Sequence, residues 1–189
     1  MVLNIKTKMK KTFISAFALV AIAFASQTQV QAQSKMSMSD ETKMVGGAAM
    51  YPTKDIIDNA VNSKDHTTLV AAVKAAGLAE TLSGKGPFTV FAPTNEAFDK
   101  LPAGTVASLL KPEKKKDLAG ILTYHVIAGN YKAADLKDGL ELATVQGQKV
   151  KFTKKDGQWY INDAKITITD AVSSNGVTHV IDGVLMPKK

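Results

Sequence analysis

The spacing of apolar residues changes midway along the chain, and this change limits the fold more than any other feature. In the first half, apolar residues recur at helical intervals, most clearly over residues 69–78. From residue 140 onward, short alternating runs are separated by turn residues. One of these turns, Asp156-Gly157, is a strong hairpin signal. Helices followed by strands predict an α+β domain with a mainly antiparallel sheet.

Several elements can be placed from local chemistry. We predict a strand over residues 88–92, where β-branched and aromatic residues cluster before Pro93. Thr94 can cap the next helix, because its hydroxyl can accept from a first-turn amide. The apolar runs 124–127 and 177–185 predict two further strands. The predicted core is Phe88, Phe91, Phe98, Val126, Ile127, Trp159, Ile166, Val180 and Val184.

The N-terminus has the three parts of a secretory signal. Four lysines within residues 6–11 precede an apolar run over residues 12–25, and no acidic residue occurs before Asp40. That run is shorter than the roughly 20 apolar residues that span a bilayer. Small residues at Val30 and Ala32 fit a cleavage site. We therefore predict a signal peptide over residues 1–32, a secreted protein in the periplasm, in the medium or at the cell surface, and a mature chain without a transmembrane segment.

Residues 33–50 are rich in Ser, Met, Gly and Ala and show no apolar period, which predicts a flexible leader. One domain is then expected over residues 51–189. The chain has no cysteine, so an exported form must be held together by core burial without disulfides. The net charge of +7 falls to +3 without the signal lysines, and arginine is absent. Both features argue against nucleic-acid binding.

Three ordered stretches resemble the signatures of the fasciclin domain family. The first runs from Phe88 to Phe98 (FTVFAPTNEAF), with Leu101-Pro102 behind it. The second is Tyr124-His125 between aliphatic residues, and the third runs from Asn175 to Pro187 (NGVTHVIDGVLMP). Together they extend the resemblance over residues 51–187.

The resemblance implies a β wedge of short, mainly antiparallel strands flanked by N-terminal helices. It also implies a non-catalytic adhesion module without a cofactor, whose partner is a protein or polysaccharide of the cell surface or matrix, or a second copy. The motif residues to which it assigns a mainly structural role are Thr94, Asn95, Phe98, Tyr124, His125, His179 and Asp182.

We place the partner-binding surface at Asp170, Ser173, Ser174 and Asn175, because a polar turn before the last strand should face water. Family members that bind integrins carry an acidic residue followed by isoleucine near this point. Asp170 keeps the carboxylate, but Ala171-Val172 follow it. Integrin-type binding is therefore not expected.

Two other classes of function remain as alternatives. Met36, Met38, Met44 and Met50 could bind Cu(I) weakly, since thioethers are soft ligands. An enzyme is the least favoured class, because there is no G-x-S-x-G elbow and no thiol nucleophile. The histidines His66, His125 and His179 lack metal-ligand spacing, so we expect hydrogen-bonded core residues and no metal site.

Overall fold

The structure is a computed structural model that describes residues 42–188. The predicted signal peptide, residues 1–32, and the leader up to residue 41 lie outside the described residues. Among residues 42–188, no helix combines the length and apolarity needed to cross a membrane.

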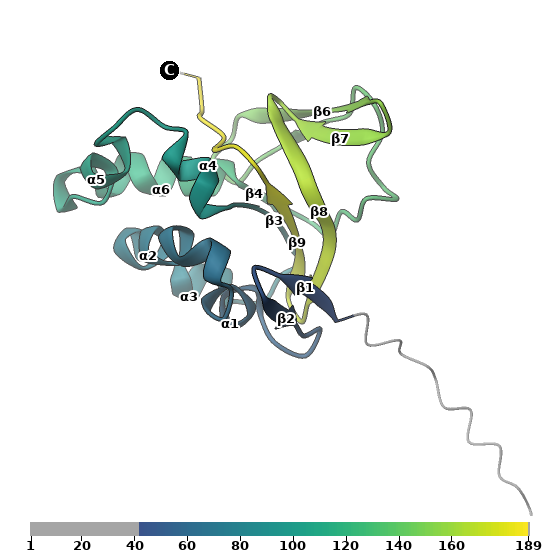
Figure 1. The fold of residues 1–189 in the computed structure, drawn as a ribbon, viewed down its shortest axis with the longest axis horizontal. Helices are drawn as coiled ribbons and strands as arrows, with labels where there is room; N and C mark the ends of the chain where they lie inside the picture. The colour runs from purple at the N-terminus through teal and green to yellow at the C-terminus, as the bar shows by residue number, and fades with distance from the viewer. Residues whose placement is uncertain (1–41, 189) are drawn as a thin grey trace, which may run out of the picture. The chain divides into compact units, whose positions relative to one another are not determined.

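A seven-stranded sheet with the order β4-β3-β9-β8-β7-β6-β5 forms the centre of the domain (Figure 1). Its strands are β3 (Phe88–Pro93), β4 (Val126–Ala128), β5 (Glu141–Ala143), β6 (Lys149–Lys155), β7 (Gln158–Ile161), β8 (Ala164–Ser173) and β9 (Gly176–Ile181). β3 and β9 pair in parallel, whereas the other neighbouring pairs of this sheet are antiparallel. The α+β class and the mainly antiparallel sheet are confirmed.

The sheet nearly closes on itself, because the chain after β5 returns to the strand at the opposite edge. The amide of Val145 donates to the carbonyl of Val126 at 2.8 Å, and the amide of Gln146 donates to that of Thr123 at 3.3 Å. A buried cluster fills the enclosed space: Phe91, Tyr124, Ile127, Leu136, Val150, Phe152, Ile161, Ala164, Ile166, Ile181 and Leu185. Each fully buried aliphatic or aromatic side chain contributes about 1.5–3 kcal/mol to stability.

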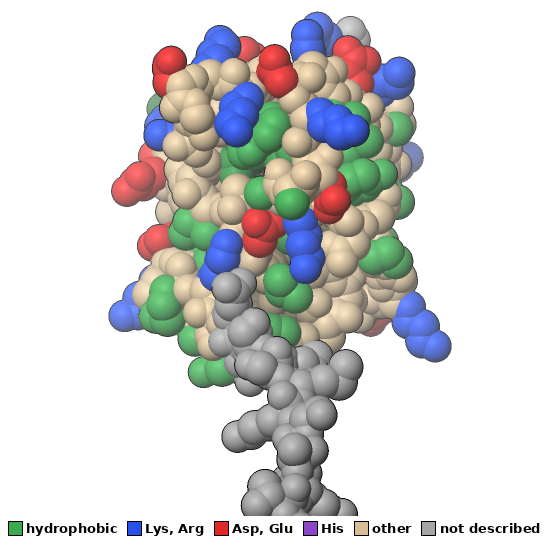
Figure 2. Space-filling view, turned by 90° about the vertical axis from the view of Figure 1, so that its right-hand side faces the viewer, with side chains coloured by type: hydrophobic (Ala, Val, Ile, Leu, Met, Phe, Trp, Pro, Cys, Tyr) green, Lys and Arg blue, Asp and Glu red, His purple; other side chains and the backbone are tan. Residues whose placement is uncertain are grey.

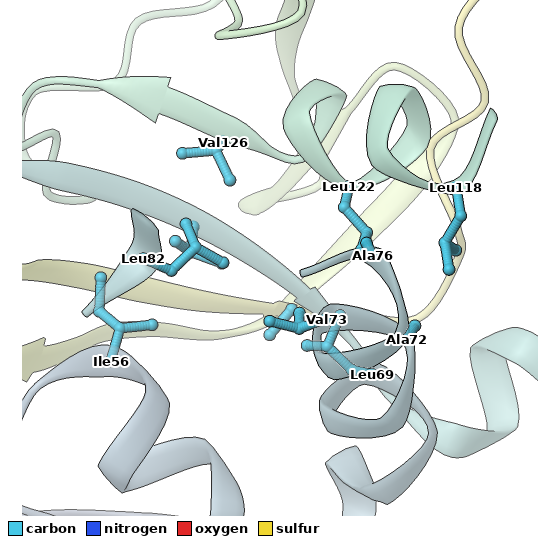
Figure 3. Close-up of a cluster of buried hydrophobic side chains, with 11 residues drawn as sticks. Ile56, Leu69, Ala72, Val73, Ala76, Leu82, Leu118, Leu122 and Val126 are labelled. Carbon is cyan, nitrogen blue, oxygen red and sulfur yellow. The ribbon is translucent and has the colours of Figure 1, made fainter. Parts of the chain in front are cut away.

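Helices pack on the part of the sheet that contains β3 and β4. They are α1 (Ile56–Val61), α2 (Thr67–Ala76), α3 (Ala79–Leu82), α4 (Asn95–Asp99), α5 (Thr105–Leu109) and α6 (Lys115–Tyr124), with 3-10 turns η1 (Lys64–His66) and η2 (Pro112–Lys114). Figure 3 shows Ile56, Leu69 and Leu122 converging with Val126 of β4 in a second buried cluster. The helical spacing over residues 69–78 thus marks a real core face.

The folded domain begins earlier in the chain than the predicted leader, residues 33–50, allows. Residues 43–50, expected to be flexible, form a hairpin of β1 (Lys43–Val45) and β2 (Ala48–Met50). Gly46 and Gly47 turn the chain with φ of +57° and +75°, values that glycine adopts at little cost. Val45 and Met50 bury against Ala171 of β8 and its neighbours. Three-residue strands are too short for their period to be seen in the sequence.

Other boundaries also shift. The run 124–127 is not all strand, because α6 continues to Tyr124, His125 caps it and β4 begins at Val126. The last strand ends at Ile181, earlier than predicted. The Asp156-Gly157 hairpin is present, with φ of +50° and +78° at the two turn residues.

Candidate functional site

The first motif joins two helices. The Thr94 hydroxyl accepts from the amide of Ala97 at 3.3 Å and so caps α4, as predicted. Asn95 Oδ1 accepts from the amide of Thr68 at 3.0 Å, and its Nδ2 donates to the Lys64 carbonyl at 2.9 Å. Phe98 is partly buried against the helical cluster. These side chains fix α4 against the start of α2.

Tyr124 lies at the end of α6 and is 4% exposed. Its hydroxyl donates to the Lys149 carbonyl at 3.3 Å and accepts from Asn162 Nδ2 at 3.1 Å. Asn162 sits in the two-residue turn between β7 and β8 and adopts a positive φ of 51°, a conformation that asparagine tolerates better than most residues. Tyr124 therefore ties the helix to β6 and to that turn.

His125 is 2% exposed and uses both ring nitrogens. Nδ1 donates to the Ile121 carbonyl at 2.8 Å, and Nε2 accepts from the amide of Leu185 at 2.9 Å. A carbonyl can only accept and an amide can only donate, so the ring must be neutral with its proton on Nδ1. Burial lowers the pKa of His125 from 6.5 to about 4, against a smaller raising effect of the Ile121 carbonyl.

His179 is fully buried in β9, where its ring stacks on Phe91 at a centroid distance of 5.4 Å. Nε2 donates to the Tyr131 carbonyl at 2.8 Å, and Nδ1 accepts from the amide of Asp170 at 3.3 Å. Burial is the main cause of the lowered pKa of His179; the Tyr131 carbonyl and Asp170 raise it, and Lys43 lowers it further. His125 and His179 are thus the hydrogen-bonded interior histidines that the sequence predicts.

Asp170 occupies an irregularity of β8, between Ile168 and Ala171, with a φ of +57°. Its carboxylate was expected to face a partner, but the side chain is half-buried and Oδ1 accepts from the amide of Ala133 at 2.7 Å. Together with His179, Asp170 fastens the segment 131–133 to the strands. One oxygen of this half-buried carboxylate is therefore engaged within the domain.

Ser173, Ser174 and Asn175 of the neighbouring turn were expected to face water, and only Ser174 does so. Ser173 is 7% exposed, and its hydroxyl accepts from Asn59 Nδ2 at 2.9 Å. Asn175 accepts from the amide of Ile56 at 3.0 Å and donates to the Leu82 carbonyl at 2.7 Å. Only Ser174 of this turn has an exposed side chain. The burial of Ser173 and the partial burial of Asn175 could not be predicted from the sequence. A polar residue that bonds buried backbone groups and a polar residue that faces water look the same in the sequence.

Asp182 follows β9 and holds two neighbours. Its Oδ1 accepts from the amide of Lys165 at 2.9 Å, and its other oxygen pairs with Lys100 at 3.6 Å. The motif residues described so far therefore connect helices, strands and turns within the domain. Figure 2 agrees, since no histidine is visible on the face that it shows, where basic, acidic and hydrophobic side chains are interspersed.

Two open grooves flank the C-terminal segment, residues 184–188, and no local sequence pattern predicted either of them. The first, of about 910 Å³, has Tyr124 and Asn162 in its wall with the exposed Lys149 and Lys151. The second, of about 790 Å³, lies along α5 and α6. Both grooves share Met186 and Lys188. We call this pair, with the segment between them, the C-terminal grooves.

Two side chains hold the C-terminal segment in place. Leu185 is 3% exposed in the enclosed core, with its amide bonded to His125. Gln148 grips the end of the segment: Nε2 donates to the Lys188 carbonyl at 2.7 Å, and Oε1 accepts from the Lys188 amide at 3.0 Å. Met186 between them is 48% exposed. The segment is therefore a fixed ridge between two hollows.

No group of three or more His, Asp or Glu side chains within residues 42–188 is arranged to hold a metal ion. Of the methionines in the copper alternative, Met36 and Met38 lie outside the described residues. Met44 is 61% exposed and Met50 is 5% exposed. These two lie on opposite faces of the β1–β2 hairpin, because Met44 pairs with Ala49 and Met50 with Lys43. They do not converge on one ion.

Comparison with known proteins gives a consistent result. The fasciclin domain model matches residues 64–187. Protein sll1483 of Synechocystis sp. is 49% identical over 152 residues, which cover 80% of this chain and 84% of that protein. The chain belongs to the fasciclin domain family.

Two further matches have names that refer to surfaces or adhesion. Cell surface glycolipoprotein MPB83 of Mycobacterium bovis is 37% identical over 148 residues, or 76% of this chain and 64% of that protein. The FAS1 domain pair of the insect cell adhesion molecule Fasciclin I superposes with a TM-score of 0.65, over 72% of this chain and 52% of that one. The identity to that structure is 18%, so this likeness concerns the fold alone.

Proposed function

We propose that this chain is an exported, non-catalytic adhesion module that binds a protein or polysaccharide of the cell surface or matrix. The proposal is based on the different locations of the motif residues and of the grooves. The motif side chains hold the fold together from within, while the C-terminal grooves offer hollow, solvent-facing surface. Family membership supports the class of function, and the tripartite N-terminus supports export to the periplasm, the medium or the cell surface.

The partner surface is proposed to be the C-terminal grooves. They combine the exposed charges of Lys151 and Lys188 with the apolar Met186 and the polar wall near Tyr124. Partly apolar hollows with a polar rim are typical of interfaces. The turn at residues 173–176, our sequence-based choice, keeps only Ser174 as an exposed side chain. We retain Ser174 as the competing location.

The test begins with the mature protein, tagged and used to capture its partner from the cell envelope and the culture medium of its own source. The captured partner is then titrated against a double variant, Lys151→Glu and Lys188→Glu. Its matched control, Lys85→Glu with Lys137→Glu, changes net charge equally at exposed lysines that line neither groove.

The groove variant should bind at least about tenfold more weakly. Charge reversal removes the attraction between these lysines and the partner and replaces it with repulsion. The control should stay within about twofold of the unaltered protein. Equal binding by both variants would remove the grooves as the partner surface. If Ser174→Arg alone abolished binding, the turn at residues 173–176 would take their place.

A further inference from the structure

His66 stands apart from the other two histidines. It ends η1 and is 2% exposed. Its Nδ1 lies 2.8 Å from the hydroxyl of Ser63, itself 1% exposed. Its Nε2 is a buried atom without a hydrogen-bond partner among the described residues. Buried polar atoms are nearly always paired with protein or with ordered water, so this nitrogen points to a missing partner.

A cavity of about 20 Å³ lies beside His66. Its lining is Val45, Met50, Ile56, Asn59, Ala60, His66, Ala92, Ala171, Ser173 and Thr178. A water molecule needs roughly 10–15 Å³ of such space and two to four polar partners. The volume therefore suits one water molecule and nothing much larger.

The polar groups of the lining can supply those partners. Asn59 is already committed, because Oδ1 accepts from the Tyr51 amide and Nδ2 donates to the Tyr51 carbonyl and the Ser173 hydroxyl. The Ser173 oxygen accepts that bond and keeps its own hydrogen to donate. Thr178 also lines the cavity. His66 Nε2 and the Ser173 hydroxyl supply the two polar partners that a water molecule needs.

We infer that this cavity is a binding site for a single structural water molecule, held by His66 Nε2 and the Ser173 hydroxyl. Water can donate and accept, so it satisfies Nε2 whichever ring nitrogen carries the proton. Burial lowers the pKa of His66 and so favours the neutral ring; Asp65 raises the pKa, as does the Ala92 carbonyl, which lies near the ring without completing a hydrogen bond to Nε2. The bound water connects η1 to β8.

The location gives the water a structural role. Val45 and Met50 bring the β1–β2 hairpin to the cavity, Asn59 brings α1, and Ser173 brings β8. The hairpin is also bonded directly to this region, because the amide of Lys64 donates to the Gly46 carbonyl at 3.1 Å. The water thus bonds to η1 and β8, while the hairpin and α1 enclose it through Val45, Met50 and Asn59.

Two measurements on the mature protein test the inference. A crystal structure at atomic resolution should show one ordered water within hydrogen-bonding distance of both His66 Nε2 and Ser173 Oγ. Oxygen-17 magnetic relaxation dispersion should count one fewer long-lived water in His66→Phe, whose ring lacks the nitrogen. His66→Gln, which keeps a polar group at the end of the side chain, is the matched control and should retain that water.

The inference is overturned if the crystal structure shows no water there and Nε2 bonded directly to the Ala92 carbonyl. It is also overturned if His66→Phe and the unaltered protein hold the same number of long-lived waters. The crystal structure of the unaltered protein decides the question even if both variants fail to fold.

Discussion

The amide of Leu185 donates a 2.9 Å hydrogen bond to Nε2 of His125, the histidine of the tyrosine–histidine motif. The bond joins the second fasciclin signature to the end of the third, 60 residues further along the chain. It also anchors the ridge between the C-terminal grooves. A single interior contact thereby connects the family's sequence motifs to the shape of the proposed partner surface.

Acid should destabilise the domain through this bond. Protonation of Nε2 would set an N–H against the Leu185 amide, and the folded pKa of about 4 lies below the unfolded value of 6.5. The neutral ring's contribution is complete above pH 6.5 and is lost as the pH falls toward 4. By pH 5 this one group should remove about 2 kcal/mol of unfolding free energy.

Urea unfolding at pH 7.5 and pH 5.0 measures this loss. His66 and His179 also have lowered pKa values, so the total loss should exceed that of His125 alone. His125→Gln, whose amide can still accept from Leu185, should show a smaller difference between the two pH values. A His125→Gln difference equal to that of the unaltered protein would contradict the assignment.

Asn175 should be far more important for stability than its neighbour Ser174. Asn175→Ala leaves the Ile56 amide and the carbonyls of Leu82 and Gly84 without their side-chain partner. The expected cost is about 2–3 kcal/mol, because each buried group left unpaired is penalised. Ser174→Ala is the adjacent control and should stay within about 0.5 kcal/mol, as exposed substitutions do. Thermal unfolding of the two variants side by side distinguishes them, and similar losses would show that Asn175 is not a structural residue.

The β1–β2 hairpin should behave as part of the domain. Met50→Ala should cost about 2 kcal/mol or more, because a buried methionine is truncated. Met44→Ala, on the exposed face of the same hairpin, should change stability by about 0.5 kcal/mol or less. Chemical denaturation measures both. If Met50→Ala is as stable as Met44→Ala, the hairpin does not contribute to the core.

Tyr124→Phe isolates the contribution of one hydroxyl. The ring stays in the core, but Asn162 Nδ2 and the Lys149 carbonyl lose their partner. We expect a loss of about 1 kcal/mol, which is the typical net value of such a bond. An unchanged melting temperature would mean that water replaces the hydroxyl from the adjoining groove.

The elements and their class could be predicted because their signals are local. The helical spacing over residues 69–78, the Thr94 cap and the Asp156-Gly157 hairpin each depend on neighbouring residues. The hairpin at Gly46-Gly47 was missed because its strands are short and their burial depends on β8. The Ser-, Met-, Gly- and Ala-rich composition of residues 33–50 therefore led to the prediction that they are flexible.

The site could not be predicted in the same way. The interior roles of Asp170 and Asn175 depend on Ala133 and Ile56, which are 37 and 119 residues away. The C-terminal grooves form where α6 and β6 pack against residues 184–188. No local sequence pattern predicts this packing. His125 and His179 were recognisable as interior residues because aliphatic neighbours surround them in the sequence.

Hydrogen–deuterium exchange with and without the captured partner locates the partner-binding surface. Partner binding should slow exchange in residues 184–188 other than Leu185 and in the groove walls formed by α6 and β6. The interior amide of Leu185 should be protected in both states, which supplies an internal reference. Protection confined to residues 173–176, with unchanged exchange along the grooves, would place the partner at that turn and not at the C-terminal grooves.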